Sequence, residues 1–264
     1  MGMSEHFFDF AAEANLTKHL GGKEATDELI ELCHITKDTY LLDVGCGVGQ
    51  TPVYIAEKIG AHITGVDINP GMVQRSQERA EKHKVTYLTE FHKADAQKLP
   101  FPDNSFDAVI TESVTAFPKD KQRAVNEYKR VTKPGGYIGL NESTWLKTPP
   151  PVEIEEWAGQ EIGAAVKPLT SEEWKALLEK ARLKIILTRV REIKVNEEAQ
   201  GIIKRYGYSG MINTMCNAFK LYLKNPNYRR FVKKVQTKGV TPPNLTEYFG
   251  YGIYIAQKSC DENP

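Results

Sequence analysis

The residues best suited to do chemistry lie in one short segment, Asp43-Val44-Gly45-Cys46-Gly47-Val48-Gly49-Gln50, which follows the aliphatic pair Leu41-Leu42. A second carboxylate, Asp67, ends the next apolar run. An aliphatic run that stops at glycines is typical of a buried parallel strand, and glycine allows the turn to approach a ligand closely. Asp67 is placed to accept hydrogen bonds from both hydroxyls of a ribose. These residues predict a site for a nucleotide-like cofactor.

The glycine spacing helps to choose the cofactor. The dinucleotide fingerprint has its third glycine at the position that Gln50 occupies here, whereas Gly49 comes one residue earlier. This shift disfavours NAD and FAD as cofactors. It therefore also disfavours a nicotinamide-dependent oxidoreductase as the function.

Three later segments accompany the glycine motif in the order 65–68, 94–107 and 133–136. Together with residues 43–49 they resemble the motifs of the class I S-adenosylmethionine-dependent methyltransferases, over roughly residues 35–143. Within that family, residues 44–49 and the pair Glu112-Ser113 resemble small-molecule and lipid methyltransferases, including the sterol and tocopherol C-methyltransferases. The substrate motifs of those enzymes have no clear counterpart here, so the resemblance leaves the acceptor open.

The resemblance implies S-adenosyl-L-methionine as the cofactor and assigns roles at its amino-acid and ribose end. Asp43 would receive the ammonium group, directly or through water, and would otherwise be a partner for the backbone of the glycine turn. Asp67 would hold the ribose in a charge-assisted bidentate contact, the alternative being a plain acid near a helix start. The turn itself would line the ligand through Gly45, Gly47, Gly49 and Gln50.

The resemblance also implies where the adenine lies. Ile68 and Met72 would flank the ring with apolar surface, although a methionine at this spacing is also ordinary core. Asp95 and Ala96 match the family's position at the adenine edge. The alternative for this pair is a surface turn before Leu99.

Methyl transfer from a sulfonium is an in-line displacement, so the protein must hold the acceptor about 3–3.5 Å from the methyl group. A base is needed only where the acceptor must lose a proton early. Glu112, just past a strand, should face the sulfonium and the acceptor, because ligands of open α/β sheets bind beyond the carboxyl ends of the strands. Glu142 is a second base candidate. His19 is a third, because the N-terminal helix of this family closes over the cofactor.

Composition excludes several classes of protein. At 264 residues, with 41% apolar residues and a net charge of +1, the chain favours one domain with additions and gives no overall reason to expect nucleic acid. Its four cysteines form no CxxC pair or Cys/His cluster, so we expect no metal and a reduced, cytoplasmic setting. The sequence shows no signal peptide or membrane span, and we expect a soluble protein of open oligomeric state.

Alternating strand and helix signals predict an α/β fold, a doubly wound Rossmann-like sheet that is mostly parallel. Thr51 is expected to cap a helix that starts at Pro52, and Asn69-Pro70 to repeat the device. Gly135 is expected to stop a helix over 119–132. The resemblance implies seven strands with an antiparallel last one. The predicted strands are 39–44, 62–67, 88–93, 106–111, 136–142, 184–194 and 251–256, with helices over 171–181 and, interrupted at Gly21-Gly22, over 5–33.

Charge is uneven along the chain. No acidic residue lies between Glu198 and Glu247, whereas this stretch has nine cations. Its apolar periodicity predicts an amphipathic helical insertion. The expected organisation is a helical cap over 1–35, a cofactor-binding core over 36–195, a helical lid over 196–249, and the last strand with the tail over 250–264. The nine cations are Lys204, Arg205, Lys220, Lys224, Arg229, Arg230, Lys233, Lys234 and Lys238, and the apolar positions are Met211, Met215, Phe219, Tyr222 and Leu223.

The leading hypothesis is a methyltransferase for a small amphipathic or anionic molecule, lipid-like acceptors and peripheral membrane association included, because a lid with cations and aromatic residues complements such a molecule. A methyltransferase acting on RNA or protein ranks lower, since residues 111–114 read Thr-Glu-Ser-Val and not the Asn-Pro-Pro-Tyr of such enzymes. A non-catalytic module that binds S-adenosylmethionine is the other alternative.

Overall fold

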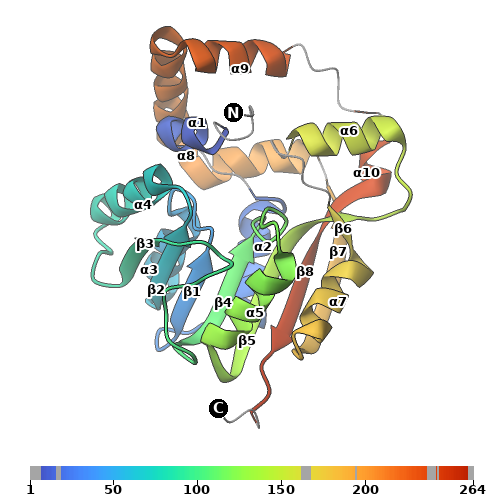
Figure 1. Cartoon of the computed structure of the whole chain (residues 1–264). Coiled ribbons are helices and arrows are strands. Elements are labelled where there is room, and N and C mark those ends of the chain that lie inside the picture. The colour runs from blue at the N-terminus through green and yellow to red at the C-terminus, as the bar shows by residue number, and fades with distance from the viewer. Residues whose placement is uncertain are drawn as a thin grey trace.

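A mixed sheet organises the molecule, whose computed structural model describes residues 7–15, 19–161, 168–193, 195–236, 242 and 244–260 (Figure 1). The strand order is β3-β2-β1-β4-β5-β8-β7, and a short strand, β6, pairs with β5. All pairs are parallel except those of β8, which runs antiparallel to both β5 and β7. The strands are β1 (Tyr40–Val44), β2 (His62–Asp67), β3 (Thr89–Lys93), β4 (Phe106–Glu112), β5 (Thr132–Trp145), β6 (Leu169–Thr170), β7 (Lys184–Glu192) and β8 (Phe249–Gln257).

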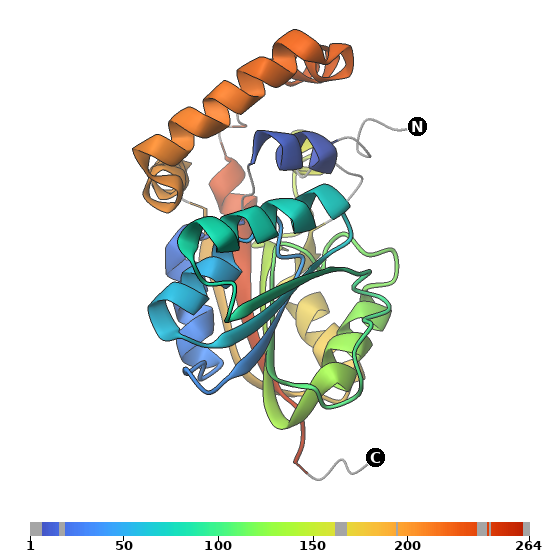
Figure 2. The same ribbon diagram turned by 90° about the vertical axis from the view of Figure 1, so that its left-hand side faces the viewer.

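Helices cover both faces of this sheet, as the doubly wound prediction requires. One apolar cluster joins the sheet to α2, α3 and α4, and a second joins its other face to α5 and α7. Helices α1, α8 and α9 lie beyond the carboxyl ends of the parallel strands (Figures 1 and 2). The helices are α1 (Phe7–Ala14), α2 (Gly22–Leu32), α3 (Gln50–Ile59), α4 (Pro70–His83), α5 (Lys121–Val131), α6 (Val152–Glu161), α7 (Ser171–Lys180), α8 (Val195–Lys224), α9 (Pro226–Gln236) and α10 (Leu245–Tyr248).

All seven predicted strands are present, and the last one is antiparallel as the resemblance implies. Two elements go beyond the prediction: the two-residue strand β6 and helix α6, which follows the proline-rich connection. The expected stop at Gly135 is wrong, because α5 ends at Val131 and the chain enters β5 directly at Thr132. Gly135 instead adopts a left-handed conformation inside β5, where its N–H donates to the carbonyl of Lys258.

The two helices that start beside the glycine turn begin in different ways. Asn69 caps α4 as predicted, since its side-chain oxygen accepts from the N–H groups of Gly71 and Met72 at 2.8 and 3.2 Å. The predicted cap at Thr51 is wrong. Gly49, in a left-handed conformation, is the N-cap of α3, and the hydroxyl of Thr51 points elsewhere.

Helices α8 and α9, which we call the lid, occupy the predicted insertion between β7 and β8. The lid rests on α1, where the ring of Phe10 lies 5.2 Å from that of Tyr228 and 5.5 Å from that of Phe231. Among the described side chains of α8, those of Thr214 and Leu221 are buried. The apolar repeat that predicts the helix faces mostly outward. The side chains of 195–209 and 234–236, which include three of the nine cations, lie outside the described residues, and so does Lys238.

Candidate functional site

The glycine turn after β1 folds back onto the end of β2. The N–H groups of Gly45 and Cys46 both donate to the carbonyl of Val66, at 2.7 and 2.9 Å. Gly45 has φ +76°, and a Cβ placed on it would lie 2.2 Å from a methyl group of Val114. The turn therefore needs glycine at this position for both its backbone conformation and its contact with the loop after β4.

Two side chains of α4 hold the outer part of the turn. The hydroxyl of Ser76 donates to the carbonyl of Gly47 at 2.8 Å, and Arg79 donates through Nε to the carbonyl of Val48 at 2.7 Å. A Cβ on Gly49 would lie 2.8 Å from the Cα of Ser76. Sequence reasoning missed these supports, because a serine and an arginine on a surface-helix pattern give no sign of such a role.

Asp67 fixes the turn from the end of β2. Its Oδ2 accepts from the N–H of Gly47 at 3.0 Å, and its Oδ1 accepts from the N–H of Asn69 at 2.9 Å. Burial raises the pKa of Asp67, while the backbone N–H groups of Asn69, Gly47 and Ile68 act in the opposite direction. The carboxylate is thus oriented by the backbone before any ribose is bound.

Asp43 is buried at the end of β1, with 3% of its surface exposed. Burial raises its pKa well above the usual range, and the negative charges of Glu112 and Asp67 raise it further. No donor in the described part of the chain hydrogen-bonds to this carboxylate. Close by in sequence, the buried Nε2 of Gln50 lacks an acceptor among the described residues. An unpaired buried acceptor and donor suit a ligand with an ammonium and a carboxylate group, such as the amino-acid end of S-adenosylmethionine.

Glu112 lies at the end of β4 and joins three other elements. Its Oε1 accepts from the hydroxyl of Thr26 at 2.8 Å, and its Oε2 accepts from that of Thr51 at 2.6 Å. His19 approaches through Nε2, 3.3 Å from Oε1, and its Nδ1 lies 3.2 Å from the carbonyl of Leu20. The structure thus brings the two predicted catalytic residues together. The two threonines were missed as partners, since hydroxyls in helical segments carry no distinguishing pattern.

Glu142, the other base candidate, is held from the loop after β4. It is fully buried in β5, and its Oε1 accepts from the hydroxyl of Thr111 and from the N–H groups of Val114 and Thr115, at 3.0, 3.0 and 2.7 Å. Burial raises the pKa of Glu142, against the effect of these donors. Through Oε1, Glu142 supports the loop after β4, while its buried Oε2 lacks a donor among the described residues.

The predicted adenine end forms a cavity of about 300 Å³ beyond β2 and β3. Asp95 and Ile68 line it together, and Oδ1 of Asp95 accepts from the N–H of Gln97 at 2.9 Å. Met72 does not line this cavity, because it is buried with Ala12 and Val48 under α1. The remaining lining residues, which sequence reasoning did not single out, are Lys93, Ala94, Lys98 and Pro100; Ala96 packs against the cluster under α5.

Helix α1 covers the carboxyl edge of the sheet between these two ends. Phe8 meets Phe117, from the loop after β4, with ring centres 5.3 Å apart. Asn69 donates through Nδ2 to Asp9 at 2.7 Å, and Arg75 donates through Nε to the carbonyl of Ala12 at 3.2 Å. The expectation that an N-terminal helix closes over the site agrees with this packing.

The described residues contain neither a metal-ligand cluster nor a membrane-spanning helix. No group of three or more His, Cys, Asp or Glu residues is arranged to hold a metal ion there. None of the helices in that part of the chain combines the length and apolar character needed to cross a membrane.

Comparison with known proteins identifies this arrangement. The Methyltransferase domain family matches residues 42–140. An uncharacterized protein of Haemophilus influenzae is 32% identical over 223 residues, which are 83% of this chain and 88% of that protein. The chain belongs to the S-adenosylmethionine-dependent methyltransferases. A sterol 24-C-methyltransferase of Gibberella zeae is 44% identical to this methyltransferase over 108 residues, 41% of the chain, and the match spans 28% of the length of that enzyme.

Solved structures show the same fold. The cyclase SpnF superposes on this methyltransferase with a TM-score of 0.71 at 19% identity, over 96% of this chain and 94% of the other. The phosphoethanolamine N-methyltransferase 2 of Haemonchus contortus, solved with phosphomonomethylethanolamine and S-adenosylhomocysteine, gives 0.68 at 18% identity, over 96% of this chain and 57% of the other. The predicted family, fold and cofactor, S-adenosylmethionine, are confirmed, and the predicted likeness to sterol C-methyltransferases is confirmed for the cofactor domain.

Proposed function

We propose that this methyltransferase acts on a small amphipathic or anionic acceptor, held between the carboxyl end of β4 and the helices that cover it. The observation that carries the proposal is the group of three carboxylates, Asp43, Asp67 and Glu112, at the ends of the adjacent strands β1, β2 and β4. Three neighbouring negative charges favour a positively charged ligand. S-adenosylmethionine supplies a methyl group on a sulfonium cation, which suits them.

Each carboxylate has a distinct task in this proposal. Asp43, together with Gln50, binds the amino-acid end, because both offer buried groups that lack partners among the described residues. Asp67 accepts from the ribose with the oxygen surface left free by Gly47 and Asn69. Ile68 and Asp95 hold the adenine in their shared cavity.

Glu112 positions the reacting end. Both of its oxygens accept hydroxyl hydrogen bonds, from Thr26 and Thr51, which fix the orientation of the carboxylate. Its negative charge faces His19, and an imidazolium ring there can donate to Glu112 and to the carbonyl of Leu20 together. His19 is 8% exposed, so the pair forms part of the floor under the acceptor.

The nature of the acceptor is inferred from the lid. Of its described cations, Lys220, Lys224, Arg230 and Lys233 are exposed and Arg229 is half-buried. No acidic residue follows Glu198 until Glu247, which favours an anionic group on the acceptor. The acceptor of the sterol relative is an amphipathic molecule. An RNA or protein acceptor is the weaker candidate, since residues 111–114 read Thr-Glu-Ser-Val and not Asn-Pro-Pro-Tyr.

The test combines cofactor binding with turnover. Asp67→Ala should weaken binding of S-adenosylmethionine by about 1.5–3 kcal/mol in calorimetry, since a charged acceptor is lost. Asp107→Ala, at the opposite edge of the sheet, is the control and should bind the cofactor normally. Wild-type protein should release S-adenosylhomocysteine with at least one member of a panel of small amphipathic and anionic acceptors.

Three results would decide against this proposal. Equal cofactor affinity of wild type and Asp67→Ala would remove the ribose assignment. Tight cofactor binding without turnover on small molecules, but with methylation of RNA or protein, would replace the acceptor class; cofactor binding without any methylation would favour a non-catalytic module.

A further inference from the structure

The outer face of α8 carries a stripe of exposed apolar side chains. Ile212, Met215, Phe219 and Leu223 are 62%, 67%, 63% and 59% exposed, and their spacing of three or four residues places them on one side of a helix. The opposite side, with Thr214 and Leu221, is the buried one. We call these four residues the α8 stripe. Apolar side chains repeated along one exposed helix face indicate a binding surface, whereas scattered ones do not.

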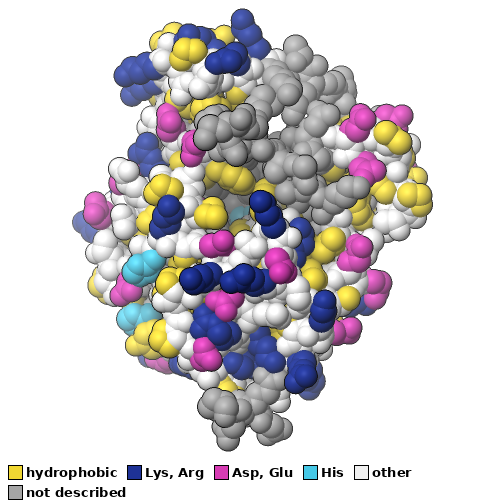
Figure 3. All heavy atoms as spheres, in the orientation of Figure 1, with side chains coloured by type: hydrophobic (Ala, Val, Ile, Leu, Met, Phe, Trp, Pro, Cys, Tyr) yellow, Lys and Arg dark blue, Asp and Glu magenta, His cyan; other side chains and the backbone are white. Residues whose placement is uncertain are grey.

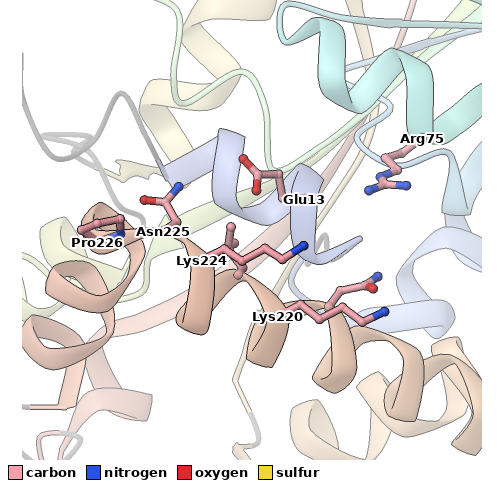
Figure 4. Close-up of a pocket in the computed structure, with 8 residues that line it drawn as sticks. Glu13, Arg75, Lys220, Lys224, Asn225 and Pro226 are labelled. Atoms are coloured by element: carbon pink, nitrogen blue, oxygen red, sulfur yellow. The ribbon is translucent and has the colours of Figure 1, made fainter.

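Cations border the α8 stripe on one flank. Lys220 and Lys224 are exposed, one turn apart, and extend from α8 into a cavity of about 410 Å³ shared with Arg75 of α4 and Glu13 of α1 (Figure 4). On α9, Arg230 and Lys233 are also exposed. Figure 3 shows dark blue and yellow side chains side by side at this end of the molecule. The cavity has the volume for a group the size of a phosphate, and three cations, Arg75, Lys220 and Lys224, line it together with one carboxylate, that of Glu13.

We infer that the α8 stripe docks the lid on the surface of an anionic lipid bilayer, with its side chains among the acyl chains and Lys220 and Lys224 on headgroup phosphates. A helix with apolar residues on one face and lysines at the flank is the pattern of interfacial membrane binding. A second copy of this chain fits less well. The segment 199–246 contains no carboxylate to neutralise its nine cations, so two α8 stripes brought together would also bring together charges of the same sign.

Docking of this kind would place the lid where amphipathic molecules are concentrated. The link from docking to the acceptor rests on the proposed function, but docking itself does not. An acceptor delivered from the bilayer would meet the lid before it meets the carboxyl edge of the sheet, since α8 and α9 lie beyond α1 (Figure 2).

Co-sedimentation with vesicles tests the inference. Wild-type protein should bind vesicles of phosphatidylcholine mixed with phosphatidylglycerol. Its affinity for vesicles of phosphatidylcholine alone should be lower by about tenfold or more. Phe219→Ser with Leu223→Ser should lower binding to the anionic vesicles about tenfold or more, because the apolar contact is lost. The matched control is Ile186→Ser with Val190→Ser, two exposed residues of β7 that are 45% and 38% accessible, which should bind like wild type.

A charge variant separates the two parts of the surface. Lys220→Gln with Lys224→Gln should weaken binding to anionic vesicles and make it less sensitive to salt, while leaving the residual binding to neutral vesicles unchanged. Circular dichroism should give wild-type melting for all these variants, because the changed side chains are exposed.

Three outcomes would overturn the inference: no binding of wild type to anionic vesicles, equal loss in the β7 control, or a concentration-dependent dimer abolished by the stripe variant. None of them bears on the proposed function. Cofactor affinity, measured by calorimetry on the same proteins, should be equal in wild type and stripe variant. If the wild-type protein did not bind the cofactor, that result would count against the proposed function alone.

Discussion

The carboxyl edge of the sheet and the lid carry charge of opposite sign and hold it differently. At the edge, Asp67 and Glu112 are buried or nearly so, and each accepts hydrogen bonds from fixed donors. In the lid, Lys220 and Lys233 are exposed. In the proposed function, the edge orients one cationic ligand with fixed geometry, whereas the lid attracts a class of molecules whose shape can vary.

The first prediction tests how rigid the edge is. Gly45→Ala should lower the free energy of unfolding by about 2–4 kcal/mol, because the left-handed backbone is strained and the new Cβ would overlap Val114. Gly60→Ala is the matched control: its φ is +81°, but the nearest atom to a Cβ there is 3.8 Å away. It should cost about 1 kcal/mol, from the backbone alone. Chemical denaturation measures both, and equal losses would show that the close approach to Val114 carries no energy.

The second prediction concerns Asp43, whose charge is unfavourable without a ligand. Its pKa is raised by burial and then by Glu112 and Asp67, so the folded protein binds a proton at this carboxyl more tightly than the unfolded chain does. The free energy of unfolding without cofactor should therefore fall as the pH rises from the ordinary carboxyl range toward the raised value. Cofactor affinity should rise over the same window, since an ammonium group pairs with the ionised form.

The substitution Asp43→Asn should separate these two effects. It should reduce both pH dependences, and the raised pKa values of Asp67 and Glu142 should account for what remains. It should also stabilise the protein without cofactor and weaken S-adenosylmethionine binding by about 1.5–3 kcal/mol. Thermal melts and calorimetry across pH provide the readouts. An unfolding free energy that rises over this pH window in wild type would contradict the assignment.

The third prediction concerns Glu112. Glu112→Gln keeps the shape but removes the charge beside His19, and a Gln amide can accept only one of the hydroxyl bonds from Thr26 and Thr51. Turnover should fall about tenfold, and cofactor affinity should change less. If the variant instead lost cofactor affinity but kept normal turnover at saturating cofactor, Glu112 would bind the cofactor away from its reacting end, and the assignment would be wrong.

The smallest effect is expected in the lid. Met215→Gln changes a side chain that is 67% exposed, so the free energy of unfolding should stay within about 0.5 kcal/mol of wild type. Denaturation beside the Gly45→Ala protein measures the contrast directly. A large loss for Met215→Gln would mean that the outer face of α8 is covered by the protein itself, and the comparison between edge and lid would fail.

These contrasts also explain what could be predicted from the sequence. The turn after β1 was predictable because its chemistry is local: glycines, a preceding strand and Asp67 occur at fixed spacing. The role of Thr51 was not, since a hydroxyl before a proline also fits a helix cap, and its partner Glu112 is 61 residues away. Likewise, periodicity predicts that α8 is a helix but not which side faces the protein, because packing on α1 decides that.

One connection in the sheet has a consequence for how such proteins can diverge. Strands β7 and β8 are antiparallel neighbours, and Glu192 pairs with Gly250. The polypeptide that leaves the sheet for the lid thus returns next to its point of departure, as in a hairpin with a very long loop. Lengthening or shortening such a loop alters closure entropy only slowly and leaves strand register untouched. The lid can therefore be replaced without changing the sheet. Under the proposed function, such a replacement could change the acceptor while the cofactor-binding residues at the carboxyl edge stay the same.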